Sequence, residues 1–372
     1  VKINDVSFSW QLPVRYRYTD PVKGEIYEPL VVVPPVTAKP DEEIKISRNN
    51  NTFNGILQMY AHADNARVME IVATADQPNQ AKQTFNPSEL IFQERNKSRE
   101  VQYTIEANRD NQYSFMMKAG SDNHKIGLKE WKKIMYDHIP PIYYFSDAKV
   151  INRNLDLKIV GKQIGYIPGA GDKIPEALIQ MGYQVTILNE KVLAQNDLQK
   201  FDAIITGIRA YNTNEWLNQY YSRLMKYIED GGNLIVQYNT SNNIGPVKAR
   251  IGPYPFNISR TRITNETSPV KFLKPSHAVL NFPNKINQKD FDGWIQERSI
   301  YHASEFDDKF ETIITMNDPG EESQDGSLVV AKYGKGSFVY TGLVFFRQLP
   351  AGVPGAYRLL ANLIALNKYK GF

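Results

Sequence analysis

Residues 201–240, FDAIITGIRAYNTNEWLNQYYSRLMKYIEDGGNLIVQYNT, decide the fold of the second half of the chain. The pattern predicts a buried strand (DAIITG), a polar loop, an amphipathic helix from about Asn214 to Asp230, and a second buried strand (NLIVQYN). Gly231 and Gly232 are the kind of residue that ends a helix. Two strands joined through a helix form a βαβ crossover, which predicts a parallel sheet covered on both faces.

The same alternation continues on both sides of this crossover. QIGYIPGAGD, from Gln163, is typical of a strand that ends in a glycine loop, and KIPEALIQMG is typical of a short helix that stops at Gly182. We expect a closing helix from about Gly355 to Asn367, and further strands in YQVTIL, GWIQERSIY, ETIITMN, GSLVVAKY and GSFVYTGL. The pattern therefore predicts an α/β domain over residues 156–372.

Residues 1–155 carry strand patterns without helical periodicity. The expected strands are EEIKISRN, GILQMYAHA, VMEIVATA, SELIFQ, REVQYTIEA and QYSFMMKA, and polar clusters separate them. Short strands at close spacing with turns between them predict an all-β sandwich domain, which we place at residues 1–155.

The composition excludes several classes of function. None of the 372 residues is cysteine, which rules out thiol nucleophiles, disulfides and thiolate metal sites. The formal net charge is only +4 and the sequence has no basic block, so we expect no nucleic-acid partner. We also expect no membrane span, because no apolar run is long enough. The 22 tyrosines and 17 phenylalanines fit β-rich structure and also fit surfaces that stack on sugars.

The glycine loop after the first α/β strand has two interpretations. Gly169-Ala170-Gly171-Asp172 resembles a phosphate-binding loop in outline. It lacks the third glycine of a dinucleotide fingerprint and the Lys-Ser/Thr pair of a P-loop. We therefore favour a tight turn in which Asp172 caps the next helix.

A second strand-end loop, GIRAYN, carries Arg209, Tyr211 and Asn212. In parallel sheets, ligands bind at the carboxyl ends of the strands. A guanidinium, an aromatic ring and an amide suit a carboxylate, a phosphate or a sugar. The alternative is structural: Arg209 pairs with a neighbouring carboxylate, and Asn212 caps the helix.

Tyr238 and Asn239 lie where many α/β hydrolases place a nucleophile elbow. That elbow needs a serine or cysteine flanked by small residues, and neither condition is met here. Thr240 and Ser241 follow, but no base is adjacent in the sequence. We therefore expect no acyl-enzyme chemistry and no catalytic residue at this position.

Two further segments supply candidate residues. Gln296-Glu297-Arg298 is expected on a strand, with Glu297 pointing opposite to its two neighbours. Arg347 follows the strand FVYTGL and suggests anion capture, although a structural role suits it equally.

The chain has five histidines, and none pairs with another at metal-ligand spacing, so we expect neither a metal nor a cofactor. His277 and His302 lie in the second half of the chain, where each either reaches the ligand crevice or packs structurally.

Several long segments resemble a bacterial family. GIRAYN, GGNLIVQYNT, WIQERSIYHASEF, NDPGE, KYGKGSFVYTGL and FFRQLPAGVPGAYRLLANL are similar to the C-terminal half of long PIG-L/LmbE-type deacetylase proteins. WQLPVRYRYTDPVKGEIYEPLVVVPPV is similar to the entry of their middle β-sandwich. The resemblance implies that 156–372 is a flavodoxin-like, class I glutamine amidotransferase-like (ThuA-like) domain. The usual elbow cysteine of that fold would then fall near Tyr238 or Asn239.

The family also implies an N-terminal zinc-dependent N-acetylglucosamine deacetylase domain with a His-Pro-Asp-Asp-Glu motif. That motif does not occur in this sequence, so no metal ligand or catalytic acid is carried over. The chain starts at Val1 rather than at methionine, and we expect a processed protein or a fragment of a longer one. The expected partners are a glycan and the deacetylase domain of the same parent chain, in the periplasm or outside the cell.

The sequence therefore favours a non-catalytic accessory region that binds glycan in the strand-end crevice. The candidate binding residues are Arg209, Tyr211, Asn212, Tyr238, Asn239, Glu297 and Arg347. Two alternatives remain open: a sugar-directed hydrolase or isomerase with Glu297 or His302 as general base, and a purely structural spacer.

Overall fold

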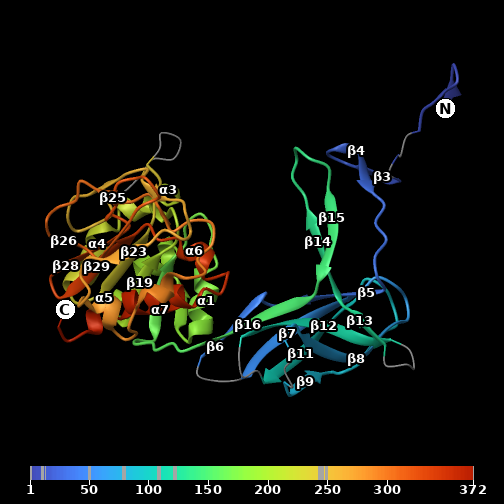
Figure 1. Cartoon of the computed structure of the whole chain (residues 1–372), viewed down its shortest axis with the longest axis horizontal. Helices are drawn as coiled ribbons and strands as arrows, with labels where there is room; N and C mark the ends of the chain where they lie inside the picture. Colours follow the sequence, from blue (N-terminus) through green and yellow to red (C-terminus); the bar gives the residue numbers. More distant parts are fainter. Residues whose placement is uncertain are drawn as a thin grey trace. The chain divides into compact units, whose positions relative to one another are not determined.

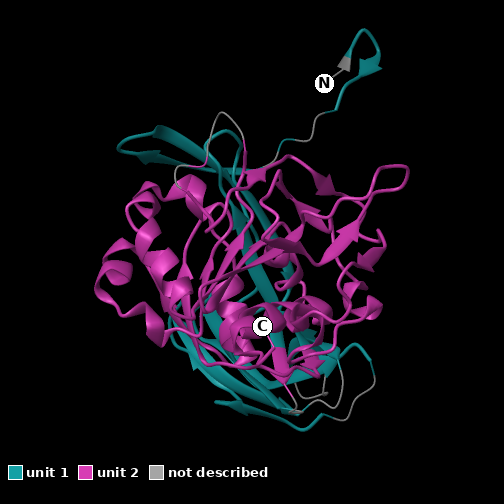
Figure 2. Cartoon of the chain, turned by 90° about the vertical axis from the view of Figure 1, so that its left-hand side faces the viewer, with its two compact units in different colours: residues 1–45, 50–152 teal, residues 46–49, 153–372 magenta. Residues whose placement is uncertain are grey.

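The structure is a computed structural model of the 372-residue chain. It describes residues 2–9, 12, 14–48, 52–77, 81–106, 110–119, 124–241, 247 and 250–371. The chain divides into two compact units, coloured separately in Figure 2: unit 1 comprises residues 1–45 and 50–152, and unit 2 comprises residues 46–49 and 153–372. The sequence places the boundary after residue 155, and it does not anticipate that residues 46–49 belong to unit 2.

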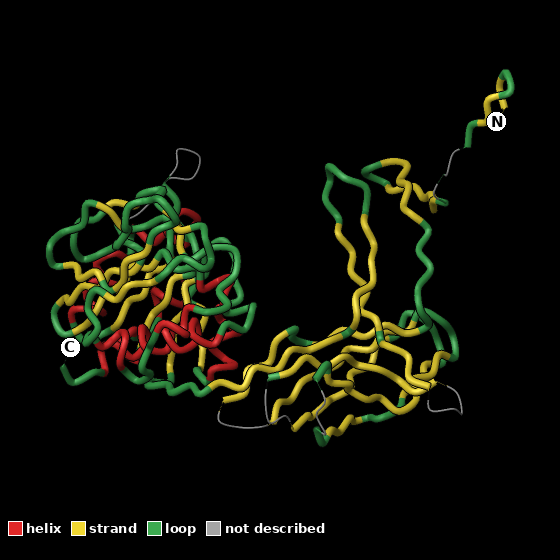
Figure 3. The backbone as a smooth tube through the Cα atoms, viewed as in Figure 1, coloured by secondary structure: helices red, strands yellow, loops and turns green. Residues whose placement is uncertain are grey.

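Unit 1 is built from strands, drawn in yellow in Figure 3. One sheet has the order β10-β8-β12-β16-β6, with β13 paired to β12, and the other has the order β5-β7-β11-β9. The strands of the first sheet are β6 (Ile44–Arg48), β8 (Ala66–Ala75), β10 (Leu90–Phe92), β12 (Asn111–Ala119), β13 (His124–Gly127) and β16 (Lys149–Leu155). Those of the second are β5 (Val36–Pro40), β7 (Thr52–Ala61), β9 (Gln83–Asn86) and β11 (Ser98–Glu106).

A single hydrophobic cluster is shared by the two sheets of unit 1. On β11, alternate residues Val101, Tyr103 and Ile105 are buried in this cluster, because side chains of a strand alternate between its two faces. Gly55 on the paired strand β7 makes room for the Tyr103 ring, since a Cβ at Gly55 would lie 2.2 Å from the Tyr103 hydroxyl.

Two hairpins and a short strand pair complete unit 1. They are β3 (Arg15–Asp20) with β4 (Gly24–Pro29), β14 (Lys129–Ile134) with β15 (Ile142–Asp147), and β1 (Lys2–Ile3) with β2 (Val6–Ser7). Glu28 joins the two hairpins: it accepts a hydrogen bond from Tyr18 at 3.0 Å on its own hairpin and one from Tyr143 on the other.

Unit 2 contains a seven-stranded sheet with the order β18-β17-β19-β20-β29-β28-β26, of which β19, β26, β28 and β29 are labelled in Figure 1. The first five strands in this order are parallel, and β28 and β26 extend the sheet with antiparallel pairing. The strands are β17 (Gln163–Ile167), β18 (Gln184–Ile187), β19 (Ala203–Thr206), β20 (Asn233–Gln237), β26 (Phe310–Thr312), β28 (Leu328–Tyr333) and β29 (Gly336–Thr341). The predicted mixed α/β architecture is thus present in the structure.

Both faces of this sheet are buried. On β20, Ile235 belongs to one hydrophobic cluster, whereas Leu234 and Val236 belong to the other. Residues of α1 (Ile174–Met181) and α7 (Pro354–Ala365) complete the first cluster, and residues of α4 (Tyr221–Glu229) complete the second. Continuous apolar runs such as NLIV are the sequence signature of strands covered on both sides.

The remaining helices are short. They are α2 (Glu190–Gln195), α3 (Ala210–Thr213), α5 (Ala278–Asn281), α6 (Phe345–Gln348) and the 3₁₀ turns η1 (Leu198–Lys200), η2 (Glu215–Asn218), η3 (Gln288–Phe291) and η4 (Leu366–Lys368). The helix predicted from about Asn214 is therefore divided into η2 and α4. Its end is as predicted: Gly231 has a φ of 113°, and its N–H bonds to the carbonyl of Ile228.

In the described part of unit 2, three antiparallel strand pairs lie outside the seven-stranded sheet. They are β21 (Asn257–Ile258) with β25 (Ala303–Ser304), β22 (Arg262–Ile263) with β24 (Ser299–Ile300), and β23 (Val270–Phe272) with β27 (Ile314–Met316). The prediction of a strand through Gln296, Glu297 and Arg298 is wrong, because only Ser299–Ile300 of that segment is a strand. Gln296 has a φ of 66°, which breaks the extended geometry that a strand needs.

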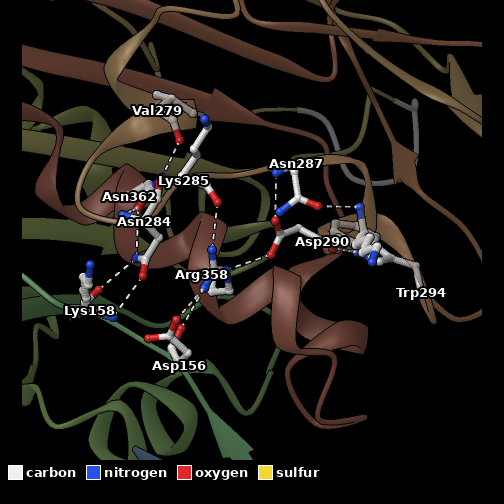
Figure 4. A network of polar contacts seen from close by, with 11 residues as sticks. Asp156, Lys158, Val279, Asn284, Lys285, Asn287, Asp290, Trp294, Arg358 and Asn362 are labelled. Carbon is white, nitrogen blue, oxygen red and sulfur yellow. Dashed lines mark hydrogen bonds and ion pairs between the residues drawn. The ribbon is translucent and has the colours of Figure 1, made fainter. Parts of the chain in front are cut away.

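A buried polar network fixes α7 to earlier parts of unit 2 (Figure 4). The Asn362 amide accepts from the backbone N–H and the side chain of Asn284 at 2.9 and 3.0 Å. It donates to the carbonyls of Val279 and Asn284 at 2.8 and 2.7 Å. Asn284 in turn bonds to the backbone of Lys158, so the network reaches the start of unit 2.

An arginine one turn away on α7 makes a second set of bonds. The Nε of Arg358 lies 2.8 Å from the carboxylate of Asp290, and its terminal nitrogens donate to the carbonyls of Asp156 and Lys285. Gly355 permits this approach, since a Cβ there would lie 1.8 Å from the carbonyl oxygen of Asp290.

We predict that Asn362→Ala lowers the free energy of unfolding of unit 2 by about 3 kcal/mol, because it leaves several buried polar groups without partners. Urea unfolding followed by tryptophan fluorescence measures the change. Asn218→Ala, at an exposed position of η2, is the matched control and should unfold like the wild type. Equal midpoints for the two variants would contradict this role of the network.

Candidate functional site

The loops that follow four neighbouring strands meet at one edge of the unit 2 sheet. Strands β17, β19, β20 and β29 are consecutive and parallel, so their carboxyl ends point the same way. The segments that leave this edge are 168–173, 207–209, 238–241 and 342–347. Four of the candidate binding residues, Arg209, Tyr238, Asn239 and Arg347, lie in these segments.

The carboxylate of Asp172 ties the first two of these loops together. It accepts hydrogen bonds from the Tyr166 hydroxyl, from the N–H of Ile174 at 3.1 Å and from the N–H of Ile208 at 3.1 Å. These backbone N–H groups are the donors that a phosphate would use at such a loop. A carboxylate of the protein itself therefore occupies the anion-binding position.

Small residues let the same two loops approach closely. The N–H of Ala170 bonds to the carbonyl of Ile208 at 2.8 Å. A Cβ at Gly169 would lie 2.0 Å from that carbonyl oxygen, and a Cβ at Gly207 would lie 2.7 Å from the Tyr166 hydroxyl. Side chains at either glycine would separate the loops.

Arg209 sits in a left-handed backbone conformation, with a φ of 58°. Its N–H donates to the carbonyl of Tyr238 at 2.8 Å, and its own carbonyl accepts from the N–H groups of Asn212 and Thr213 at 2.9 and 3.1 Å. The side chain is half-buried, and its Nε is fully buried. Within the described ranges, the Arg209 guanidinium has no hydrogen-bond or ion-pair partner.

Tyr238 lies at the centre of an aromatic group. Its ring stacks on Tyr301, with centroids 5.7 Å apart and planes at 13°, and lies 5.6 Å from the ring of Phe346. Tyr238 itself is only 8% exposed, whereas Tyr301 and Phe346 are half-buried. A ligand ring is therefore offered the faces of Tyr301 and Phe346 rather than that of Tyr238.

Charged groups surround the Tyr238 hydroxyl. Burial raises the pKa of Tyr238, the guanidinium groups of Arg209 and Arg347 oppose this shift, and Glu297 adds to it. Two cations and a carboxylate thus act on a hydroxyl that stays protonated at neutral pH. Glu297 was a candidate for the same crevice, although it lies in a different chain segment and was expected on a strand.

Glu297 and Arg347 form a pair. The Nε of Arg347 lies 3.1 Å from Oε1 of Glu297, and a terminal nitrogen of the same guanidinium donates to the side chain of Gln296. The guanidinium also lies over the ring of Phe346, at 4.9 Å from the centroid. Arg347 belongs to α6 and is well satisfied, whereas Arg209 is not.

Left-handed backbone conformations concentrate in this group. Arg209, Gln296 and Tyr301 have φ values of 58°, 66° and 53°. Such values are uncommon for residues other than glycine and are unfavourable for a bulky residue such as tyrosine. Residues held in this way persist where the surroundings enforce them, and they cluster at ligand sites.

Three candidate residues take part in internal contacts instead. Tyr211 is 1% exposed and packs in a hydrophobic cluster of unit 2. The Asn212 amide pairs with the backbone of Thr240 through bonds of 3.0 and 2.9 Å. Asn239, fully buried, accepts from the N–H of Tyr211 at 2.9 Å and donates to the carbonyl of Gln237. These side chains join α3 to the loop after β20.

The two histidines of interest are also used structurally. His277 caps α5, where its Nδ1 accepts from the N–H of Val279 at 3.2 Å. His302 is 1% exposed, and its Nε2 lies 2.7 Å from the hydroxyl of Ser299, which is fully buried. Burial lowers the pKa of His302 to about 4, so this imidazole is neutral at pH 7.

The group includes three residues that were not among the candidate binding residues, although Gln296 and Phe346 lie in segments that supplied candidates: Tyr301, Phe346 and Gln296. Tyr301 and Gln296 flank Glu297 and His302 in the segment QERSIYH, and Phe346 directly precedes Arg347. The residues next to them, Glu297, His302 and Arg347, were considered from the sequence. Because these segments are irregular, no periodicity in the sequence indicates which side chains point toward β20.

Neither a metal cluster nor a spanning helix is found in the described part of the chain. No group of three or more His, Asp or Glu residues among the described positions is arranged to hold a metal ion. The helices described are all too short or too polar to cross a membrane.

Comparisons with known proteins add little. No family model matches the chain, and no curated protein matches it. One similar solved structure is a family 123 glycoside hydrolase from Clostridium perfringens, described in a study of glycolipid glycan hydrolysis. It shares 10% identity, with a TM-score of 0.21, over 55% of this chain and 38% of that one. At so low a TM-score the similarity supports no inference about fold or function.

We predict that His302 makes the stability of unit 2 depend on pH. An unfolded histidine has a pKa near 6.5, and the folded value is about 4. Stability is therefore complete above pH 6.5 and falls as the pH drops toward 4, by on the order of 2 kcal/mol between pH 7 and pH 5. Urea unfolding at both pH values measures this loss.

The same measurement on His302→Gln is the comparison, since glutamine keeps a polar group near Ser299 but does not titrate. Its loss of stability between pH 7 and pH 5 should be much smaller, with a remainder from His277, whose pKa burial also lowers. An undiminished loss in this variant would show that His302 does not carry the dependence.

Proposed function

We propose that unit 2 is a non-catalytic binding module that holds a glycan at the carboxyl edge of its parallel sheet. The observation that carries the proposal is the group formed by Arg209, Tyr238, Tyr301, Glu297 and Arg347. It combines an unsatisfied cation, half-buried aromatic faces and a paired charge at the edge where parallel sheets bind ligands.

The absence of an accessible nucleophile favours binding over catalysis. The positions of a nucleophile elbow after β20 hold Tyr238 and Asn239, and the Asn239 side chain is bonded to backbone on both sides. Thr240 is buried, and its backbone is bonded to the Asn212 amide. No described hydroxyl at this edge is both exposed and bonded to a base.

The strand order supports the assignment of unit 2 to the flavodoxin-like, class I glutamine amidotransferase-like group. Numbered along the chain, the five parallel strands have the order 2-1-3-4-5, which is the flavodoxin order. For unit 1, two sheets around a shared cluster support the proposed β-sandwich. We extend the proposal to the parent protein: an accessory region of a PIG-L/LmbE-type deacetylase.

A second candidate function rests on the Ser299–His302 contact. A hydroxyl 2.7 Å from a neutral imidazole is the arrangement that activates a serine, and a sugar-directed hydrolase could use it. Ser299 is 0% and His302 1% exposed, however, so a substrate has no access to either. Turnover of acetylated or aryl sugars by the chain alone would favour this candidate.

We predict that the chain binds glycans and that Arg209→Ala/Tyr238→Ala loses at least about tenfold in affinity, because it removes a charge-assisted contact and the centre of the aromatic group. A glycan array identifies ligands, and calorimetry with the best ligand gives the affinities.

The control is Arg67→Ala/Tyr136→Ala, which makes the same substitutions at exposed positions of unit 1. Thermal melts of both variants establish that they are folded, and Arg209→Ala alone serves if the double variant is not. No bound glycan with the wild type, or equal binding by a folded site variant, would refute the proposal.

A further inference from the structure

We propose that the ligand of this site carries a single carboxylate, as a uronic-acid sugar does, and that Arg209 binds this carboxylate. The inference rests on the proposed function and names the ligand class within it. It comes from the difference between the two arginines beside Tyr238.

Arg209 is the arginine without a partner. Its side chain is half-buried and its guanidinium meets no acceptor among the residues that the structure describes. The buried Nε lacks an acceptor, which is unfavourable, and the terminal nitrogens are not among the buried unpaired atoms, so a group that comes from outside can reach this guanidinium. A carboxylate fits best in shape, because it accepts two parallel N–H bonds from one guanidinium.

The backbone of Arg209 is held for this purpose. Its left-handed conformation is fixed by the bond from its N–H to the Tyr238 carbonyl and by the bonds that its carbonyl accepts from α3. The base of the side chain therefore has little freedom, and ligand binding does not have to order this backbone.

Arg347 has its charge already matched. Glu297 lies 3.1 Å from its Nε, Gln296 takes a terminal N–H, and Phe346 covers its face. Among the charged side chains that act on Tyr238, Arg209 and Arg347 are cations and Glu297 is the carboxylate. Arg347 is therefore already paired, and Arg209 is the cation beside Tyr238 that a carboxylate of the ligand can pair with.

A doubly charged phosphate suits the site less well. It would face the carboxylate of Glu297, and like charges at close range repel. The backbone N–H groups of Ile174 and Ile208 are also taken, since Asp172 accepts them. Two of the amides that a phosphate site at the described loops would use are therefore not free.

The half-buried rings supply the contact for the rest of the ligand. Tyr301 and Phe346 both touch Tyr238, which fills the space between them. A pyranose ring presents an apolar face of C–H groups that packs on such rings, while its hydroxyls stay in water. A sugar acid therefore satisfies the cation and the aromatic group together.

The test is a binding titration of the full chain by saturation-transfer difference NMR with three probes. These are methyl glucuronide, the methyl ester of that glucuronide, and glucose 6-phosphate. We expect the acid to bind at least about tenfold more tightly than the ester, since the ester lacks the charge-assisted bond, and more tightly than the phosphate. Arg209→Gln should remove the preference for the acid and keep weak binding of both.

Glu297→Gln is a second and opposite test. It removes the negative charge beside Arg347 and keeps the shape, so binding of glucose 6-phosphate should improve by about tenfold. Arg67→Ala, in unit 1, should bind all three probes like the wild type. Thermal melts establish that each variant is folded.

The outcomes separate this inference from the proposed function. Equal binding of acid and ester, tighter binding of the phosphate by the wild type, or an acid preference that survives Arg209→Gln overturns the carboxylate assignment and leaves glycan binding standing. Absence of binding by every sugar on the array and every probe overturns both.

Discussion

The carboxylate of Asp172 is the contact on which the carboxyl edge of the unit 2 sheet depends, where we propose that a ligand binds. It bonds to a hydroxyl on β17, to the start of α1 and to the first residue after the Gly207 turn. The loop after β17 and the loop after β19, whose bonded residues are 36 positions apart, are thereby held at one point. Arg209 is the residue after Ile208, so its backbone position is set by the bond between Asp172 and Ile208. Neither of these two residues is among the proposed binding residues.

The same contact decides what the edge does not bind. In dinucleotide-binding and P-loop proteins, backbone N–H groups at this place hold phosphate. Here an internal carboxylate accepts the N–H groups of Ile174 and Ile208, and the positive charge beside Tyr238 is carried by side chains. A site built from guanidinium groups and rings, rather than from amides of the main chain, suits a ligand with one acid group and a flat face.

The sequence predicts the sheet of unit 2 well, because its strands are covered on both faces and their apolar runs have few alternatives. It predicts the irregular segments poorly. Gln296 and Tyr301 adopt left-handed backbone conformations that are unfavourable for glutamine and tyrosine. The local sequence therefore does not predict these conformations. The helix predicted from about Asn214 is interrupted between η2 and α4 for a comparable reason: Tyr220 has a φ of −97° and a ψ of 7°, outside the helical region.

The candidate binding residues also divide into those whose position the sequence predicts and those whose contacts it does not predict. Tyr238 follows β20 directly, Arg209 lies in the short loop after β19, and Arg347 lies in α6, the first helix after β29. Strand position can be inferred from the sequence. Whether an amide in a neighbouring position faces a ligand or the protein cannot be inferred in this way. Asn212 and Asn239 pair with backbone atoms across two loops, and only the three-dimensional course of both loops reveals that.

The polar network on α7 has a consequence for synthesis of the chain. The ribosome synthesises β17, β19 and β20 well before Arg358 and Asn362. Arg358 nevertheless bonds to the carbonyl of Asp156, and Asn362 bonds to Asn284, which bonds to the carbonyl of Lys158. Until α7 emerges, one apolar side of the nascent sheet lacks its main cover. We therefore expect unit 2 to complete its fold only after α7 has been synthesised. Until then the growing polypeptide exposes an apolar surface of the kind that chaperones bind.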